Sequence, residues 1–352
     1  MHMADALISP AVGGTMLAVT AGITAYSAKK VQNEMDESKI PLMGVMGAFV
    51  FAAQMINFSI PGTGSSGHLG GGMLLAILLG PHAGFLTMAS ILLIQALFFG
   101  DGGLLAYGCN VFNLGFYTCF VAYPFIYKKL VHKGINSRNI FMGSMISSVV
   151  GLQLGAFSVV IETLLSGKTE LPFGQFLLFM QPIHLAIGVI EGLATAAVVT
   201  FIWKARPEIL ERTAIGETLR GVPIKKVIVG FAVAAVMVGG LLSWFASANP
   251  DGLEWSLERV AGTAELESSS SIHNVFSEIQ NRIAFLPDYG FKTADEDSIE
   301  EQPVVETGNS WPSVDAGTSV SGIVGGAITL ALAVILGWII RISKDKKSRA
   351  VA

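Results

Sequence analysis

The sequence predicts an all-α membrane protein, a polytopic helical bundle with about nine membrane segments. Hydrophobic residues make up 52% of its 352 residues, and charged residues only 14%. The mean hydropathy of +0.60 lies far from that of a soluble globular domain. Apolar stretches long enough to cross a hydrocarbon layer of about 30 Å recur along the chain. Its 40 glycines would let such helices pack closely.

Eight apolar stretches are long enough to be predicted as full spans. They cover residues 8–28, 40–58, 85–99, 104–127, 140–165, 176–203, 224–246 and 320–342. A ninth stretch, 69–79, is too short for a regular crossing. Three consecutive glycines near its start and Pro81 after its end are typical of a broken or half-length helix.

The distribution of lysine and arginine predicts an inner-membrane protein with its N-terminus outside and its C-terminus in the cytoplasm. In this orientation only Lys168, Arg259, Arg282 and Lys292 lie outside, so 18 of the 22 basic residues are cytoplasmic. The loop at about 248–318 is then extracytoplasmic and strongly acidic. We expect it to be solvated, with a small domain at its start and disorder later.

Several function classes find no support in the sequence. The net charge of −4 and the lack of a basic run with interleaved aromatic residues argue against a nucleic-acid partner. A GxxxxGK[ST] phosphate loop is absent, so the chain itself is not predicted to hydrolyse ATP. We predict no organic cofactor. Cys109 and Cys119 lie ten residues apart in an apolar stretch and are predicted to be packing residues.

The first two residues, Met1 and His2, offer three nitrogen ligands to one metal ion. No positively charged region precedes the first apolar stretch, so a cleaved signal peptide is not predicted. Methionine should also be retained before a residue as large as histidine, which keeps the amine on Met1. This amine, the His2 backbone nitrogen and the His2 imidazole Nδ1 can close two adjacent chelate rings in one plane.

His68, in the glycine-rich loop 61–68, is the predicted fourth ligand. A square-planar set of four nitrogens favours Ni²⁺ or Cu²⁺, because these ions prefer that geometry and best displace an amide proton. Nickel is therefore the first choice. In the alternative, His2 is a disordered terminal residue and His68 caps the short helix that follows.

Polar residues within apolar stretches are costly and are treated as functional candidates. They are Gln95, Asp101, Asn110, Asn113, Glu162, His184 and Glu191. They could orient the metal ligands or hold the bundle together through buried hydrogen bonds. Asp5 lies three residues from His2 and is predicted to accept a hydrogen bond from its imidazole. His82, His132 and His273 are predicted to be solvated.

The motifs of the first part resemble a known family. They are Met-His-Met-Ala-Asp-Ala-Leu at 1–7, Gly-Thr-Gly-Ser-Ser-Gly-His-Leu-Gly-Gly-Gly at 62–72, Gln-Ala-Leu-Phe-Phe-Gly-Asp-Gly-Gly at 95–103, Asn-Val-Phe-Asn at 110–113 and His-Leu-Ala-Ile-Gly-Val-Ile-Glu-Gly at 184–192. Together they resemble the NikM/CbiM substrate-binding components of nickel and cobalt energy-coupling-factor (ECF) transporters. The resemblance implies seven membrane segments and a metal held by Met1, His2 and His68.

The second part, with Pro-Asp-Gly-Leu-Glu-Trp at 250–255, resembles the NikN or PDGLE type of two-span partner. We therefore predict a metal-binding membrane domain over residues 1–221 and a NikN/PDGLE-like part over residues 222–352. The resemblance implies capture and import of Ni²⁺ in the lipid bilayer by a non-enzymatic subunit. Its implied partners are an ECF-type transmembrane coupling protein and cytoplasmic ABC ATPase subunits. The turn 80–82 and the basic stretch 204–226 are candidate docking segments for these partners.

Three alternatives stay open at this stage. The same architecture could take up Co²⁺ instead of nickel. An intramembrane hydrolase could use Ser65 or Ser66 as a nucleophile with His68 beside it. If these serines are not catalytic, they are predicted to support the metal site. A facilitator channel, which needs no ATPase, is the third alternative.

Overall fold

The computed structural model describes residues 2–34, 36–132, 134–167, 171–264, 266, 270–292 and 312–351, with side chains up to 344 in the last segment. In chain order the elements are η1 (Asp5–Leu7), α1 (Pro10–Asn33), α2 (Lys39–Gln54), β1 (Phe58–Ile60), β2 (Ser65–Gly67), α3 (Gly72–Leu79), α4 (Pro81–Ile94), η2 (Gln95–Phe99), α5 (Tyr107–Val111), η3 (Phe112–Tyr127), α6 (Lys128–Val131), α7 (Ser137–Leu165), α8 (Phe173–Ala205), α9 (Pro207–Ile215), α10 (Lys225–Gly240), η4 (Leu242–Phe245), α11 (Gly252–Ala261), α12 (Ser271–Ile283), η5 (Pro287–Tyr289) and α13 (Ala316–Val351).

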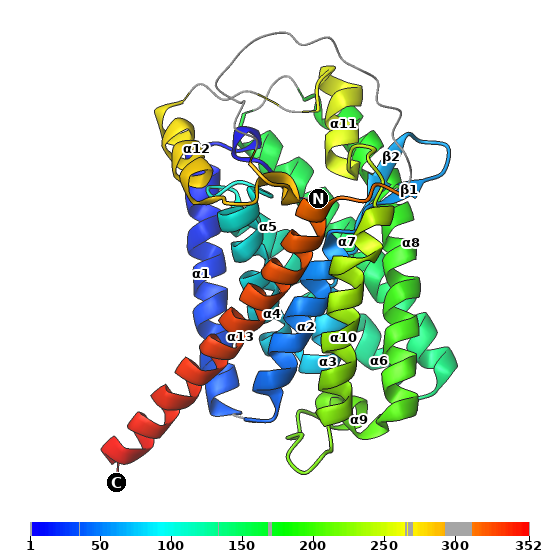
Figure 1. The fold of residues 1–352 in the computed structure, drawn as a ribbon, viewed down its shortest axis with the longest axis vertical. Coiled ribbons are helices and arrows are strands. Elements are labelled where there is room, and N and C mark those ends of the chain that lie inside the picture. The colour runs from blue at the N-terminus through cyan, green and yellow to red at the C-terminus, as the bar shows by residue number, and fades with distance from the viewer. Residues whose placement is uncertain are drawn as a thin grey trace.

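The described chain forms a helical bundle with one short antiparallel hairpin, β1–β2 (Figure 1). Six helical stretches have the length and apolar composition needed to cross a membrane. They are Pro10–Asn33, Pro81–Phe99, Tyr107–Val131, Ser137–Leu165, Phe173–Ala205 and Ala316–Lys344. The prediction of an all-α membrane protein is therefore confirmed, whereas the count of nine segments and the orientation stay predictions.

The short segment around residues 69–79 forms an eight-residue helix, α3, in the centre of the bundle. Every residue of α3 is buried. Glycine makes this packing possible, because a Cβ on Gly72 would lie 2.3 Å from Thr118 Oγ1 and 2.5 Å from the Leu114 carbonyl oxygen. The chain enters α3 through Gly71, whose φ of 76° favours glycine.

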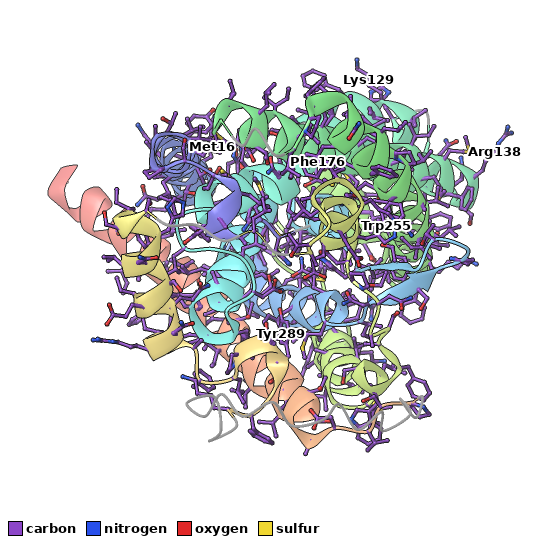
Figure 2. All side chains as sticks on the ribbon, turned by 90° about the horizontal axis from the view of Figure 1, so that it is seen from above. Met16, Lys129, Arg138, Phe176, Trp255 and Tyr289 are labelled. Atoms are coloured by element: carbon purple, nitrogen blue, oxygen red, sulfur yellow. The ribbon has the colours of Figure 1, made fainter. Side chains whose placement is uncertain are left out.

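The C-terminal part packs against the bundle at two places. Helices α10 and α13 lie beside α2, while α11 and α12 cover the end of the bundle that carries the β1–β2 hairpin (Figure 1). Figure 2 looks onto this end and shows Trp255 of α11 and Tyr289 of η5 there. Trp255 Nε1 donates a hydrogen bond to the Thr63 carbonyl oxygen over 3.0 Å.

The acidic loop at about 248–318 was expected to be solvated, with a small domain at its start, and its described residues between 250 and 292 are folded. This stretch forms α11, α12 and η5 and packs on the bundle. His273, predicted to be solvated, is 6% exposed, and its Nε2 lies 2.9 Å from the Ile8 carbonyl oxygen. Helix α11 buries Leu253 and Leu257 against the bundle, whereas α12 buries His273 and leaves most of its apolar side chains exposed. Residues 293–311, where disorder was expected, lie outside the described residues.

Candidate metal site

The N-terminal segment is inserted between the ends of the helices. Met3 is fully buried, and its N–H donates to Asn110 Oδ1 over 2.7 Å. Its carbonyl oxygen accepts from Asn110 Nδ2 at 3.1 Å and from the Gly103 N–H at 2.9 Å. These three bonds fix the backbone directly after His2, so His2 is not a disordered terminal residue. Met1 lies outside the described residues.

The His2 imidazole is held between a carboxylate and a second imidazole. Its Nδ1 lies 2.9 Å from Asp101 Oδ1, and its side chain is 7% exposed. The His2 and His68 rings stack with centroids 5.0 Å apart and planes within 6°. Among the residues that the structure describes, His2 Nε2 is buried and has no hydrogen-bond partner. A buried polar atom of this kind costs roughly 1–3 kcal/mol and calls for an explanation.

Glycine allows the N-terminal segment to approach the loop after η2. A Cβ on Gly103 would fall 1.8 Å from Asp5 Oδ1, and a Cβ on Gly102, whose φ is +80°, would fall 2.8 Å from Asn110 Nδ2. The prediction that Asp5 binds the His2 imidazole is wrong. Its Oδ1 accepts from the Ala106 N–H at 2.8 Å, and Asp101 holds His2 instead.

Side chains of the bundle bond to the backbone that directly follows His68. Gly70 N–H and Gly71 N–H donate to the two carboxylate oxygens of Glu191 over 2.9 and 3.1 Å. Gln54 Nε2 donates to the Gly70 carbonyl oxygen at 2.8 Å, and Gln95 Nε2 donates to Gln54 Oε1 at 3.0 Å. Two of the predicted polar residues, Glu191 and Gln95, therefore support the segment that follows His68.

Burial and neighbouring groups set the protonation states of His68 and Asp101. Burial lowers the pKa of His68 to about 3, so this imidazole is neutral and has a lone pair for a metal ion. Burial alone would raise the pKa of the Asp101 carboxyl, but the charge and hydrogen bonds from His2 and Tyr289 outweigh it and hold this pKa below its usual range. The pocket thus combines an ionised carboxylate with a neutral imidazole.

These groups line one pocket of about 380 Å³, which we call the metal pocket. Its lining includes His2, His68 and Asp101 from the first part of the chain and Asp251, Glu254 and Tyr289 from the C-terminal part. The sequence identified the motif at 250–255 but assigned it no place at the site. Tyr289 was missed entirely, because no local signal connects it with Asp101, 188 positions earlier in the chain.

Side chains alone do not complete a metal site in this pocket. Among the residues that the structure describes, no group of three histidine, cysteine, aspartate or glutamate side chains is arranged to hold a metal ion. Two imidazoles together with backbone nitrogens remain as candidate ligands. The site therefore suits a metal that binds main-chain nitrogen better than one that needs three or four side chains.

Comparisons with known proteins identify the family of this chain. A family model described as the cobalt uptake substrate-specific transmembrane region, CbiM, matches residues 2–209. The chain belongs to the CbiM family. A PDGLE domain model matches residues 225–342. We refer to these two parts as the CbiM region and the PDGLE region.

Relatives include proteins with both regions. A protein of Archaeoglobus fulgidus that bears the name NikMN, for fused nickel transport, is 32% identical over 94% of this chain and 96% of its own. The cobalt transport protein CbiM of Geobacter sulfurreducens is 28% identical over 61% of this chain and 63% of its own. A crystal structure of a transition metal transporter matches 63% of this chain and all of its own, with 32% identity and a TM-score of 0.53.

The other polar residues predicted for the CbiM region, Asn113, Glu162 and His184, are not among the residues that line the metal pocket. Asn113 Nδ2 donates to Glu162 Oε2 at 2.8 Å and lies 3.8 Å from Met3 Sδ, so this pair supports the residue after His2. His184 makes its contact within α8, with Nδ1 2.8 Å from the Met180 carbonyl oxygen. Its Nε2 is buried and has no hydrogen-bond partner within the described ranges.

The serines of the His68 loop connect the two regions. The Ser66 hydroxyl donates to the Asn249 carbonyl oxygen at 2.8 Å, and the Ser66 N–H donates to the Pro250 carbonyl oxygen at 2.8 Å. The Ser65 hydroxyl donates to the Ser66 carbonyl oxygen at 3.1 Å. An activated serine would donate to a base instead, so this geometry gives no support to a hydrolase.

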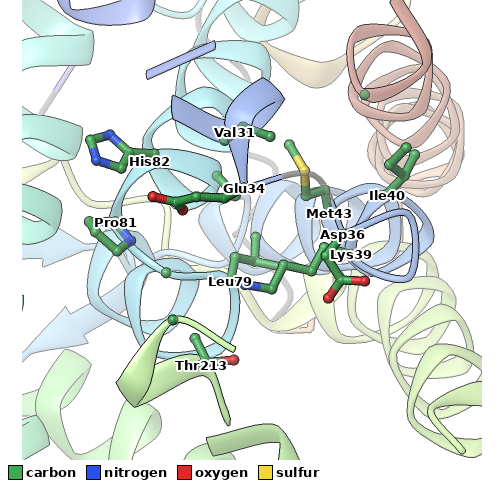
Figure 3. Close-up of a pocket in the computed structure, with 14 residues that line it drawn as sticks. Val31, Glu34, Asp36, Lys39, Ile40, Met43, Leu79, Pro81, His82 and Thr213 are labelled. Atoms are coloured by element: carbon green, nitrogen blue, oxygen red, sulfur yellow. The ribbon is translucent and has the colours of Figure 1, made fainter. Parts of the chain in front are cut away.

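A second, smaller pocket of about 70 Å³ lies at the end of the bundle that carries α9 (Figure 3). Glu34, Asp36, Lys39 and His82 are among its lining residues. His82, predicted to be solvated, is half-buried, with Nδ1 3.3 Å from Ser27 Oγ. His132 is exposed, as predicted. Cys109 and Cys119 are buried and unpaired, as expected of packing residues.

Proposed function

We propose that this protein is the substrate-binding component of an ATP-driven ECF transporter and that it captures Ni²⁺ outside the cell. Nickel appears in the name of the fused relative that covers nearly the whole chain. The two stacked, buried imidazoles carry the proposal from the structure, because one has a buried nitrogen without a partner and no third ligating side chain accompanies them among the described residues. Cobalt, which the name of the Geobacter relative includes, is the alternative substrate.

In the proposed complex four nitrogens surround the ion in a plane. They come from the Met1 amine, the His2 backbone and imidazole Nδ1, and the His68 imidazole. In the structure Nδ1 of His2 faces Asp101. A half-turn of the ring would free Nδ1 for the metal and bring the other side of the ring, with Nε2–H, toward Asp101. Such a carboxylate fixes both the orientation and the tautomer of a metal-bound imidazole.

The remaining features of the transporter follow from the same proposal. The N-terminus and the metal pocket face the outside of the inner membrane, the C-terminus faces the cytoplasm, and the chain crosses with nine segments. The domain boundaries are 1–221 and 222–352. A transmembrane coupling protein and cytoplasmic ABC ATPases supply the energy, since this sequence has no phosphate-binding loop of its own.

Metal binding by purified protein tests the proposal. With its native N-terminus the protein should form a yellow, diamagnetic, one-to-one complex with Ni²⁺, in preference to Co²⁺ and Zn²⁺. His2→Ala and His68→Ala should each lower the affinity by more than the roughly 10–100-fold that loss of a supporting residue costs. Affinity should rise with pH, because the chelate releases the His2 amide proton.

His132→Ala serves as the control, since His132 is exposed and far along the chain from the pocket-lining residues. Its nickel complex should match that of the unchanged protein. A complex that persists in both His2→Ala and His68→Ala would contradict the proposed site. A paramagnetic complex of higher coordination number in the unchanged protein would contradict the planar geometry.

A further inference from the structure

The PDGLE region reaches the metal pocket through one phenol. The Tyr289 hydroxyl donates a hydrogen bond to Asp101 Oδ2, and the other oxygen of the same carboxylate, Oδ1, lies 2.9 Å from His2 Nδ1. A continuous chain of contacts therefore runs from η5 through Asp101 to the imidazole. All three side chains line the pocket.

The backbone that carries Tyr289 is strained. Asp288 and Tyr289 have φ values of 48° and 60°, in the left-handed region that residues other than glycine rarely occupy. Such a conformation is costly and persists only where the surroundings fix it. Because backbone strain of this kind is common at functional sites, the side chain that this turn positions is a functional candidate.

Several contacts hold the turn in place. The Tyr289 ring stacks on Phe99 with centroids 5.0 Å apart and planes at 21°. The Ser321 hydroxyl of α13 donates to the Tyr289 carbonyl oxygen at 2.9 Å, and the Leu286 N–H donates to the Phe98 carbonyl oxygen at 3.2 Å. Ring and backbone are thus fixed from both regions, and the hydroxyl has little freedom to leave Asp101.

We propose that Tyr289 is a positioning residue of the metal site. It holds the Asp101 carboxylate in one orientation, and that carboxylate faces the His2 imidazole. Once the ring has made the half-turn proposed above, the same carboxylate accepts from Nε2–H and keeps Nδ1 toward the metal. The PDGLE region thereby completes the support of a metal site whose ligands all belong to the CbiM region. This inference rests on the proposed function, and it gives the PDGLE region a direct part in metal affinity.

Tyr289→Phe tests the inference, because it keeps the ring on Phe99 and removes only the hydroxyl. The nickel dissociation constant should rise on the order of 10-fold, the lower end of the effect of a lost supporting residue. Tyr107→Phe is the matched control, since it removes a phenol that donates over 2.9 Å to the Ala89 carbonyl oxygen. That bond supports α4, and its loss should leave nickel affinity unchanged.

A double-mutant cycle with Asp101→Ala separates positioning from a general loss of stability. If Tyr289 acts through Asp101, then Tyr289→Phe should change nickel affinity by less than about twofold in the Asp101→Ala background. The visible absorption band of the nickel complex should shift in Tyr289→Phe and stay unchanged in Tyr107→Phe.

The outcomes distinguish this inference from the proposed function. Equal affinities and spectra for Tyr289→Phe and the unchanged protein would overturn the positioning role while leaving the nickel site intact. A full 10-fold loss in the Asp101→Ala background would also overturn it, because Tyr289 would then act without Asp101. If the unchanged protein itself forms no planar nickel complex, the proposed function fails first.

Discussion

The two ends of the bundle each hold a pocket with a histidine and carboxylates, but the polar groups of the two pockets are satisfied differently. At the α9 end, Asp36 accepts hydrogen bonds from the Ser38 and Leu219 N–H groups, and His82 contacts Ser27. At the metal-pocket end, His2 keeps a buried nitrogen with no partner in the described part of the chain. Composition does not separate these pockets. The unsatisfied atom does, because such an atom is costly unless something binds it.

The backbone shows the same contrast. Around the metal pocket, glycines let chain segments approach within distances that any side chain would block, as at Gly102 and Gly103. At the other end, Gly80 adopts a φ of +85°, but a Cβ there would meet only an ordinary contact at 3.9 Å. The close approach at Gly103 includes the backbone of the N-terminal segment, whereas at Gly337, which lines the second pocket, a Cβ would meet the Ile40 side chain, at 2.8 Å. Substitutions should therefore have unequal effects on metal binding at the two ends.

The largest effect is expected from Gly103→Ala. The added methyl group would overlap Asp5 Oδ1 at 1.8 Å and approach the Asp5 backbone nitrogen at 2.5 Å, so the N-terminal segment must shift. Since Met3 also bonds to the Gly103 N–H, the shift should reach His2. We expect nickel affinity to fall at least about 100-fold, because displacement of a ligand costs more than loss of a supporting residue. Isothermal titration calorimetry with Ni²⁺ measures it.

Gly14→Ala is the control for this substitution. Gly14 lies in α1, and nothing lies within 4 Å of a Cβ added there. The change should leave nickel affinity as it is and raise helix stability by about 0.5–1 kcal/mol. Unchanged nickel binding in Gly103→Ala would show that the close approach at this loop is not needed.

Glu191→Gln should have an intermediate effect. An amide can accept from only one of the Gly70 and Gly71 N–H groups and turns its own donor toward the other. The mismatch should lower the unfolding free energy by about 1–3 kcal/mol and nickel affinity on the order of 10-fold. Thermal unfolding with and without Ni²⁺ measures both effects. Glu162→Gln should lower nickel affinity less, because Glu162 bonds to Asn113 and not to the His68 loop. An equal loss of nickel affinity in the two variants would contradict a specific role of Glu191 in supporting the His68 loop.

Much of this architecture was predictable from local sequence. Apolar length predicted the helices, and the glycine run and Pro81 predicted the broken segment that became α3. The chelating pattern of Met1 and His2 and the loop position of His68 predicted a shared metal site, which stays a prediction, and the structure brings the two histidines together. These features depend on neighbours in the chain or on residue chemistry alone.

The parts that could not be predicted depend on contacts distant in sequence. Asp5 was expected to bond to the His2 imidazole because it is near in the chain. Its carboxylate instead accepts from the Ala106 N–H, and Asp101 contacts the imidazole. The contact of Tyr289 with Asp101 needs both α13 and η2 to be in place. The acidic stretch at 250–292 was interpreted by composition, which could foresee neither the buried apolar face of α11 nor the contact of His273 with Ile8.

The smallest effect is expected from His82→Ala at the α9 end. The substitution removes the contact with Ser27 and the ring contacts with Tyr26 and Phe120, so it should cost about 0.5–1.5 kcal/mol of stability. Nickel affinity should stay within about twofold, since effects at well-separated sites add independently. Titration calorimetry with Ni²⁺ on the His82→Ala and His68→Ala variants compares the two ends directly. A nickel affinity that falls in both variants would mean that the α9-end pocket shares in metal binding, and the distinction between a satisfied and an unsatisfied pocket would then have no functional meaning.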